Sequence, residues 1–311
     1  MKFAPLSLND IVPWADLLAT AFDRQPDQMA QLLHFLQPET NLIACGAWDG
    51  AELVAQYSCL LRELYLPMLE RCVPVGLSIN MAVHPDYRGQ GLVKQVANPV
   101  YETLAARGVV AGAGFSNAAG VQVDKRSAGY GYEVVGRLRP YLLWLHPQKQ
   151  CPDFYLTDQW PNLPFLPVEM ETAVQFAWTP DSLKHRFACH PFRSYRFGVW
   201  QQGGSVAGLV VYRPIRLIGL TAVALLAAHS SDLAELLRRC VGAMAENGYR
   251  LAHLVGSPAT PLLAVLRETA VCLPQPISRN PYYLTLKPLS PDLPHTAFCF
   301  ENWSCLGGDV L

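Results

Sequence analysis

The feature that most constrains the fold is an apolar strand that runs through a glycine-containing turn directly into a helix. Residues 75–83 have the apolar character of a buried strand, and Gly89 and Gly91 lie in the turn. Residues 92–107 show the period of an amphipathic helix, with Gly108 as its stop. Strand and helix signals also alternate before and after this segment. The order predicts an α/β (α+β) unit, with a mixed sheet flanked by helices.

The remainder of the first half follows the same alternation. A strand precedes a helix that Asn9 can cap, a second helix follows, and Asp49-Gly50 is typical of a hairpin turn. The expected strands cover residues 2–8, 41–48, 52–61, 75–83, 109–115, 133–138 and 141–145, and the expected helices residues 10–22, 27–36, 92–107 and 117–127.

Proline divides the chain into two domains. Residues 147–180 contain six prolines and little periodicity, which is typical of a linker. Beyond it, a hairpin at Gly203, a strand, a helix that Ser231 can cap, a strand, a helix and a strand repeat part of the first order. We therefore predict a domain at 1–146, a linker at 147–180 and a second domain at 181–311.

The composition excludes several classes of protein. A formal net charge of −1 gives no overall field that would attract nucleic acid or an anionic membrane. The longest apolar run, 218–228, is too short for a bilayer, and residues 1–10 lack the features of a secretory signal, so we expect a cytoplasmic location without membrane insertion. Nine scattered cysteines without a C-x-x-C pair predict reduced thiols and no metal.

The turn after the strand has the composition of an anion site. Gly89 and Gly91 let backbone amides crowd together, and the first N–H groups of the following helix have no partner within the helix. These amides and the helix dipole favour a diphosphate, and Arg88 adds a mobile positive charge. The residues alone predict a phosphate-bearing ligand. The alternative is an ordinary turn with a capping glycine.

This segment resembles the acetyl-CoA signature of the GNAT acyltransferases, V-x-P-x-[YF]-[RQ]-x-[KRQ]-G-x-[GA] after an apolar strand. Val93 departs from the small residue that usually ends the signature. Further on, Asn117 follows an apolar strand, and residues 129–132 read GYGY where the family has G-F. The resemblance covers about residues 1–145 and implies that the second half is a degenerate GNAT-like domain. The residues that match the signature are Val83, Pro85, Tyr87, Arg88, Gln90 and Gly91.

The resemblance implies acetyl-CoA as co-substrate, without a metal. In such enzymes the strand before the turn splays from its neighbour, its backbone holds the pantetheine arm, and the turn amides hold the pyrophosphate. The implied contacts are Met81, Ala82 and Val83 for pantetheine, Arg88, Gly89, Gln90, Gly91 and Leu92 for the pyrophosphate, and Asn117 for the cofactor arm.

Acyl transfer to an amine also needs a base and an acid. Many family members place a glutamate on the strand before the turn, but residues 75–83 carry no carboxylate. Glu63 and His84 are the candidate bases; they could instead be a solvated charge and a turn histidine. The family has a tyrosine that acts as the general acid, but serine or lysine stands at the corresponding position here. Tyr130 and Tyr132 are therefore the candidate acids. The alternative is that they pack in the core.

The second half lacks an R-x-x-G-x-G turn and is expected to bind no second cofactor. Residues 183–195 and 303–309 resemble segments of two-module relatives. This implies that His185, Arg186 and Asp309 contact a polar acceptor; the alternative for Arg186 and Asp309 is a structural salt bridge.

Three functions are therefore open. The first is an N-acyltransferase for a small-molecule amine such as an amino sugar, which could act as a homodimer and needs no nucleic-acid partner. The second is a transferase for a protein or peptidoglycan-type amine, and the third is a non-catalytic acyl-CoA-binding module.

Overall fold

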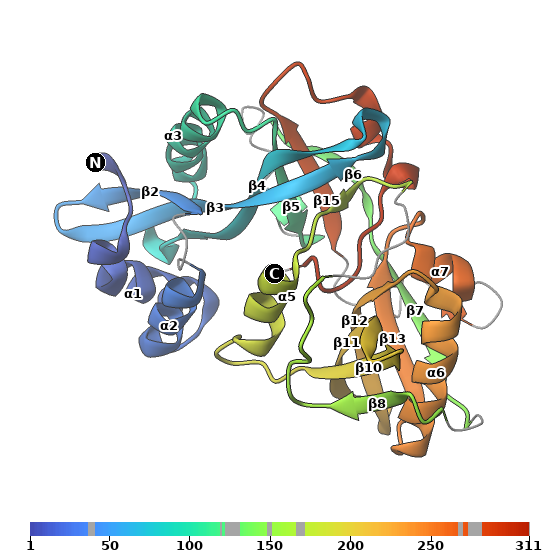
Figure 1. Cartoon of the computed structure of the whole chain (residues 1–311). Coiled ribbons are helices and arrows are strands. Elements are labelled where there is room, and N and C mark those ends of the chain that lie inside the picture. Colours follow the sequence, from blue (N-terminus) through green and yellow to red (C-terminus); the bar gives the residue numbers. More distant parts are fainter. Residues whose placement is uncertain are drawn as a thin grey trace. The chain divides into compact units, whose positions relative to one another are not determined.

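The structure is a computed structural model that describes residues 1–36, 41–118, 120–121, 131–147, 151–165, 172–266, 270–272 and 282–310 (Figure 1). The chain divides into two compact units. Unit 1 comprises Met1–Leu64, Cys72–Gly136 and Tyr282–Phe298, and unit 2 comprises Tyr65–Arg71, Arg137–Pro281 and Cys299–Leu311.

Unit 1 is built on a mixed sheet whose strand order is β1-β2-β3-β4-β5-β15-β6. Strands β4 and β5 are parallel, and the helix α3 joins them. A parallel pair needs such a crossover connection. The strands are β1 (Lys2–Pro5), β2 (Leu42–Asp49), β3 (Glu52–Leu66), β4 (Arg71–Val83), β5 (Ala111–Ser116), β6 (Glu133–Arg137) and β15 (Tyr283–Pro288).

Three helices accompany this sheet: α1 (Ile11–Phe22), α2 (Pro26–Leu36) and α3 (Leu92–Ala106). The buried face of α3 presents Val96, Val100 and Leu104 to a cluster that includes Tyr57 and Cys59 of β3. At the N-terminus, Ser7 caps a 3-10 turn (Leu8–Asp10) that leads into α1, so the expected cap at Asn9 is wrong. The expected helix at 117–127 lies mostly outside the described residues.

Unit 2 holds a second mixed sheet, in the order β14-β7-β13-β12-β11-β10-β8. Its parallel pair is β12 and β13, joined by α6 (Leu233–Glu246). One face packs on α6 and α7 (Pro261–Leu266), and the other packs on α5 (Pro180–Leu183) and the π-helical turn Lys184–Ala188. The strands are β7 (Arg139–Trp144), β8 (Phe154–Thr157), β10 (Arg196–Gln202), β11 (Ser205–Leu217), β12 (Leu220–Ser230), β13 (Leu251–Gly256) and β14 (Ala270–Cys272).

The units do not follow the boundaries expected at 146 and 181. Strand β7, expected to finish the first domain, pairs with β13 in unit 2, and β15, expected in the second domain, pairs with β5 in unit 1. Residues 147–180 include β8, which pairs with β10, so part of the expected linker belongs to a sheet. The physical reason is that the unpaired edges of β5 and β13 can each pair with any strand that reaches them. The local sequence of a strand does not indicate which edge it will pair with.

None of the helices in the described part of the chain is long and apolar enough to cross a bilayer. Within the same residues there is no group of three or more histidine, cysteine or acidic side chains that could hold a metal ion.

Candidate functional site

Strands β4 and β5 are paired along only part of their length. The parallel register runs from Val75 with Ala111 to Ser78 with Gly114, whereas β4 continues to Val83 and β5 to Ser116. Just beyond the last pair, Asn80 adopts a φ of 48°, a left-handed conformation that is rare within a strand. The two strands therefore part after Ser78, as the resemblance implied.

The turn that follows β4 is held by side-chain contacts on both sides. His84 caps the 3-10 turn Pro85–Tyr87, because its Nδ1 accepts a hydrogen bond from the Asp86 amide at 3.4 Å. The Tyr87 hydroxyl donates to Asp49 Oδ2 at 2.8 Å, which ties the turn to the hairpin between β2 and β3. Arg88 Nε donates to the Val83 carbonyl at 3.4 Å. Its two Nη groups have no partner among the described residues.

The N-terminus of α3 is open. Gly91 occupies the N-cap position with a φ of 71°, no side chain caps the helix, and the first turn carries no acidic residue. Gly89 also has a positive φ, of 83°, and a Cβ at either glycine would meet no atom within 4 Å. Arg88 to Gly91 are exposed, whereas Leu92 is buried. The first amides of α3 thus have no side-chain cap in the described structure, and an uncapped helix N-terminus favours an anion.

The other cofactor contacts implied by the sequence lie on the same strands. Met81 and Val83 are half-buried against the core cluster beneath α3, and Ala82 is buried. Asn117 is exposed just after β5, where its Oδ1 accepts a hydrogen bond from the Gly120 amide at 2.8 Å. The structure brings Met81 to Val83 and Arg88 to Leu92 together at the carboxyl end of β4.

The candidate bases are in different situations. Glu63 is exposed on β3 and makes no hydrogen bond or ion pair within the described residues. His84 is half-buried, and its Nδ1 is used by the Asp86 amide, so only Nε2 is left for chemistry. Tyr130, the first candidate acid, lies outside the described residues.

Tyr132, the second candidate acid, belongs to a tyrosine cluster. Its hydroxyl lies 3.3 Å from that of Tyr57, which accepts a hydrogen bond from the Tyr101 hydroxyl at 2.7 Å. A Cβ at Gly112 would lie 2.6 Å from the Tyr132 hydroxyl, which places that oxygen beside the paired part of β5 rather than where the strands part. The Lys287 ammonium stacks over the Tyr101 ring at 4.9 Å, and burial lowers its pKa. Sequence reasoning did not single out Tyr57, Tyr101 or Lys287, because three isolated residues on different elements give no local signal.

The proposed acceptor residues of unit 2 are tied to the end of the chain. Arg186 is only 6% exposed; its Nη2 donates to the Val310 carbonyl at 3.1 Å, its Nε has no partner, and burial lowers its pKa. Asp309 accepts hydrogen bonds from Trp178 Nε1 at 3.0 Å and from the Leu306 amide at 2.7 Å. The charge of Asp309 raises the pKa of Arg186, against the larger lowering effect of burial. His185 is half-buried in the π-helical turn.

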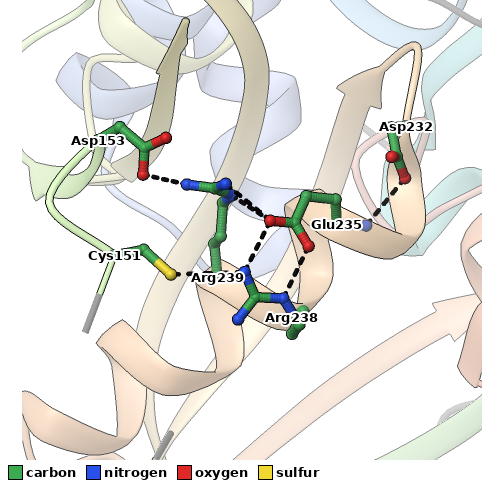
Figure 2. A network of polar contacts seen from close by, with 6 residues as sticks. All are labelled: Cys151, Asp153, Asp232, Glu235, Arg238 and Arg239. Atoms are coloured by element: carbon green, nitrogen blue, oxygen red, sulfur yellow. Dashed lines mark hydrogen bonds and ion pairs between the residues drawn. The ribbon is translucent and has the colours of Figure 1, made fainter. Parts of the chain in front are cut away.

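The helix of unit 2 that corresponds to α3 is closed at its N-terminus (Figure 2). Asp232 caps α6 by accepting a hydrogen bond from the Glu235 amide at 2.9 Å; Ser231, the expected cap, does not. Glu235 binds Arg238 at 2.6 Å and Arg239 at 2.7 Å, and Arg239 also pairs with Asp153. Mainly the hydrogen bond from Arg238 lowers the pKa of Glu235 to about 2. The Asp232 carboxylate of the chain itself therefore occupies the region where α3 is open, while the Glu235 carboxylate is bound to its two arginines further along α6.

Comparison with known proteins agrees with this geometry. Residues 2–134 match the family model described as acetyltransferase (GNAT) domain. No curated protein sequence matches the chain. Among solved structures, a GCN5-related N-acetyltransferase from Anabaena variabilis ATCC 29413 is similar over 93% of this chain and 73% of its own, with a TM-score of 0.70 and 11% identity.

Two further structures are similar over the same share of this chain. A conserved protein of unknown function from Enterococcus faecalis V583, described as a probable N-acyltransferase, gives a TM-score of 0.67 at 13% identity over 72% of its length. Eis1 from Mycobacterium abscessus gives 0.62 at 14% identity over 74%. Identities this low show a shared fold, and the two sheets fit a two-module arrangement. The family match is confined to residues 2–134, so this part of the chain is identified as an acetyltransferase (GNAT) domain.

Proposed function

We propose that this protein is an N-acyltransferase that moves the acetyl group of acetyl-CoA to the amine of a small polar acceptor such as an amino sugar. The observation that carries the proposal is the open N-terminus of α3 beside the point where β4 and β5 part. Family membership supports the reaction class, and the acceptor is our inference from the polar residues of unit 2.

The donor site is proposed as follows. Amides from Gly89 to Leu92 hold the pyrophosphate, and the free Nη groups of Arg88 supply a positive charge. Beyond Ser78 the backbone of β4 is not paired with β5, so the carbonyl and amide groups of Met81 and Val83 can bond the amide-rich pantetheine arm. Asn117, at the end of β5, contributes its amide group.

The chemistry needs three functions from the chain. The amine attacks the thioester carbonyl, the C–S bond breaks, and a proton passes from the amine while the thiolate leaving group takes one up. An alkyl amine has a pKa near 10, so removing its proton at neutral pH costs roughly 4 kcal/mol, which a base or desolvation must supply. We assign the carbonyl oxygen to the Val83 amide and keep Glu63 and His84 Nε2 as bases and Tyr130 as the acid.

The test replaces Gly91 by glutamate and measures acetyl-CoA binding by calorimetry. The wild-type chain is expected to bind one acetyl-CoA, and Gly91→Glu none, because the side chain and its charge would occupy the anion position. The matched control is Gly108→Glu at the other end of α3, where φ is 75° and the surrounding space is also open. It carries the same backbone strain without touching the site. Wild-type affinity in Gly91→Glu would remove the basis of the assignment.

A second function, a non-catalytic acyl-CoA-binding module, is favoured by two observations. Strand β4 carries no carboxylate, and His84 is engaged as a cap. Incubation with labelled acetyl-CoA and a panel of amines separates the two functions. Transfer or hydrolysis above the Gly91→Glu background supports the enzyme, whereas tight binding without either supports the module.

The acceptor side is proposed to lie in unit 2, with His185, Arg186 and Asp309 as contacts. Arg186 and Asp309 also have a structural role, because they make hydrogen bonds to residues 306–310. Arg186→Ala is expected to raise the acceptor KM while leaving acetyl-CoA affinity unchanged. Loss of thermal stability without that change in KM would assign the residue to folding alone.

A further inference from the structure

The hairpin between β11 and β12 ends in an unfavourable apolar tip. Leu217 pairs with Leu220, and the two residues between them, Ile218 and Gly219, have φ values of 53° and 79°, as in a type I′ turn. Such positions favour asparagine, aspartate and glycine, and a β-branched residue there is strained. Ile218 is also 82% exposed. Within this chain, Ile218 is therefore neither suited to its turn position nor buried, and this points to a contact outside the chain.

Other apolar side chains are exposed at the same end of the sheet. Leu220 is 36% exposed and Trp144 is 60% exposed. Trp144 pairs with Leu251 on β13, and Leu251 pairs with Ala222 on β12, two residues from Leu220. Two strand spacings amount to about 10 Å across the sheet and the two residues to Leu220 add about 7 Å along it, so the tryptophan lies at the same end of the sheet as the tip.

Arginines surround this tip on both faces of the sheet. Alternation along β11 puts Arg216 and Arg213 on opposite faces. Arg250 immediately precedes β13, and its amide donates to the carbonyl of Thr221, the partner of Arg216. All three arginines are exposed, and none makes an ion pair with a described residue. Glu246, at the end of α6, is the acidic residue nearest to them in sequence. The tip therefore combines apolar side chains with local positive charge, although the net charge of the chain is −1.

We propose that this hairpin tip, formed by Trp144, Arg213, Arg216, Ile218, Leu220 and Arg250, docks on the surface of an anionic lipid bilayer. Aliphatic side chains and a tryptophan can enter the headgroup layer, while arginines on both faces pair with lipid phosphates. A pocket on a protein partner would contact one face of this hairpin. A bilayer surface can contact the arginines on both faces at once, and its negative charge is complementary to theirs. The inference is independent of the proposed function. Whole-chain charge and the length of apolar runs could not indicate it, because the cluster is local.

The test is cosedimentation of the full chain with vesicles of phosphatidylcholine alone and of phosphatidylcholine mixed with phosphatidylglycerol. We expect binding to the mixed vesicles only, weakening as salt screens the arginines. Arg216→Glu together with Arg250→Glu should reduce that binding by at least about tenfold, since each basic residue at a bilayer surface contributes about 1 kcal/mol.

The variant Ile218→Asn separates docking from folding. Asparagine suits the turn, so the chain should keep or gain thermal stability while binding to the mixed vesicles falls. Val12→Asn, on α1 in unit 1, is the matched control, because Val12 is an aliphatic side chain of similar exposure, 68%. It should bind like the wild type.

Three results would overturn the proposal: equal binding to both kinds of vesicle, unchanged binding in Ile218→Asn, or a dimer in light scattering that Ile218→Asn dissolves. The last would make the tip a contact between copies of the chain. Acetyl-CoA affinity is expected to be unchanged in all these variants, so the outcome does not depend on the donor site of unit 1.

Discussion

The N-termini of α3 and α6 are the most informative pair of regions in this molecule. Each helix connects two parallel strands, β4 to β5 in unit 1 and β12 to β13 in unit 2. The first helix begins at an uncapped glycine with no acid in its first turn. The second begins at Asp232, whose side chain takes the Glu235 amide, and Glu235 adds a carboxylate in the same turn. The same fold element is thus open in one unit and filled in the other.

The difference shows what turns a helix N-terminus into a ligand site. Every α-helix offers unpaired amides and a positive dipole end, so the element alone does not confer binding. What matters is whether the chain supplies its own anion. Unit 2 does so, and its arginines 238 and 239 are occupied by Glu235 and Asp153. In unit 1 the corresponding position carries glycines and the positively charged Arg88, and we propose that a phosphate of the ligand takes it.

The largest expected effect comes from reversing the charge at the open end. Arg88→Glu should weaken acetyl-CoA binding about tenfold to a hundredfold, because a charge-assisted hydrogen bond contributes about 1.5–3 kcal/mol and the new carboxylate repels the pyrophosphate. Calorimetry measures the affinity. Arg107→Glu, at the C-terminal end of the same helix, is the control and should bind like the wild type. Equal losses in both variants would mean that general electrostatics, not this turn, holds the ligand.

At the closed N-terminus of α6 we expect an effect on stability and none on acetyl-CoA affinity. Asp232→Ala removes the cap of α6 and should lower the free energy of unfolding by about 1 kcal/mol, measured with denaturant. Acetyl-CoA affinity should not change. Ser231→Ala is the control, since Ser231 precedes the cap and the structure gives it no capping bond. A drop in acetyl-CoA affinity in Asp232→Ala would break the division of roles between the two helices.

The pH dependence of stability tests the ion pairs of Glu235 in the first turn of α6. The pKa of Glu235 is lowered from 4.5 to about 2, so the charged form is favoured in the folded state. Its contribution to stability is present above pH 4.5 and is lost as the pH falls towards 2. Glu235→Gln should therefore lower the melting temperature above pH 4.5 and converge with the wild type near pH 2. Glu246→Gln, at the other end of α6, serves as control, and a parallel offset at all pH values would contradict the assignment.

Local sequence predicted the open end of α3 and did not predict the unit boundaries, for physical reasons, whereas the donor site itself stays a prediction. The glycines at 89 and 91 and the strand before them form a contiguous motif, so spacing alone placed the open helix end. Strands β7 and β15 have ordinary strand patterns. Each pairs in the sheet of the other half of the chain, with β13 and β5 respectively, and this depends on which strand edges are unpaired in the folded structure. The hydrogen bond of Tyr132 to Tyr57 joins residues 75 positions apart, which no local pattern encodes.

The smallest expected effect concerns His84, which can be compared directly with Asp232 because both side chains cap a helical turn. If capping is its role, His84→Asn should keep both acetyl-CoA affinity and kcat within about twofold of the wild type, since asparagine is also a good cap. His84→Ala should lose a few-fold in affinity, because the turn that carries Arg88 is less well held. A catalytic base behaves differently: both variants would lose kcat, and the lost activity would return at high pH, where the amine is deprotonated without help. Measuring kcat against pH in the two variants therefore decides between the cap and the base. A loss of kcat in His84→Asn at neutral pH, recovered at alkaline pH, would show that Nε2 takes the proton.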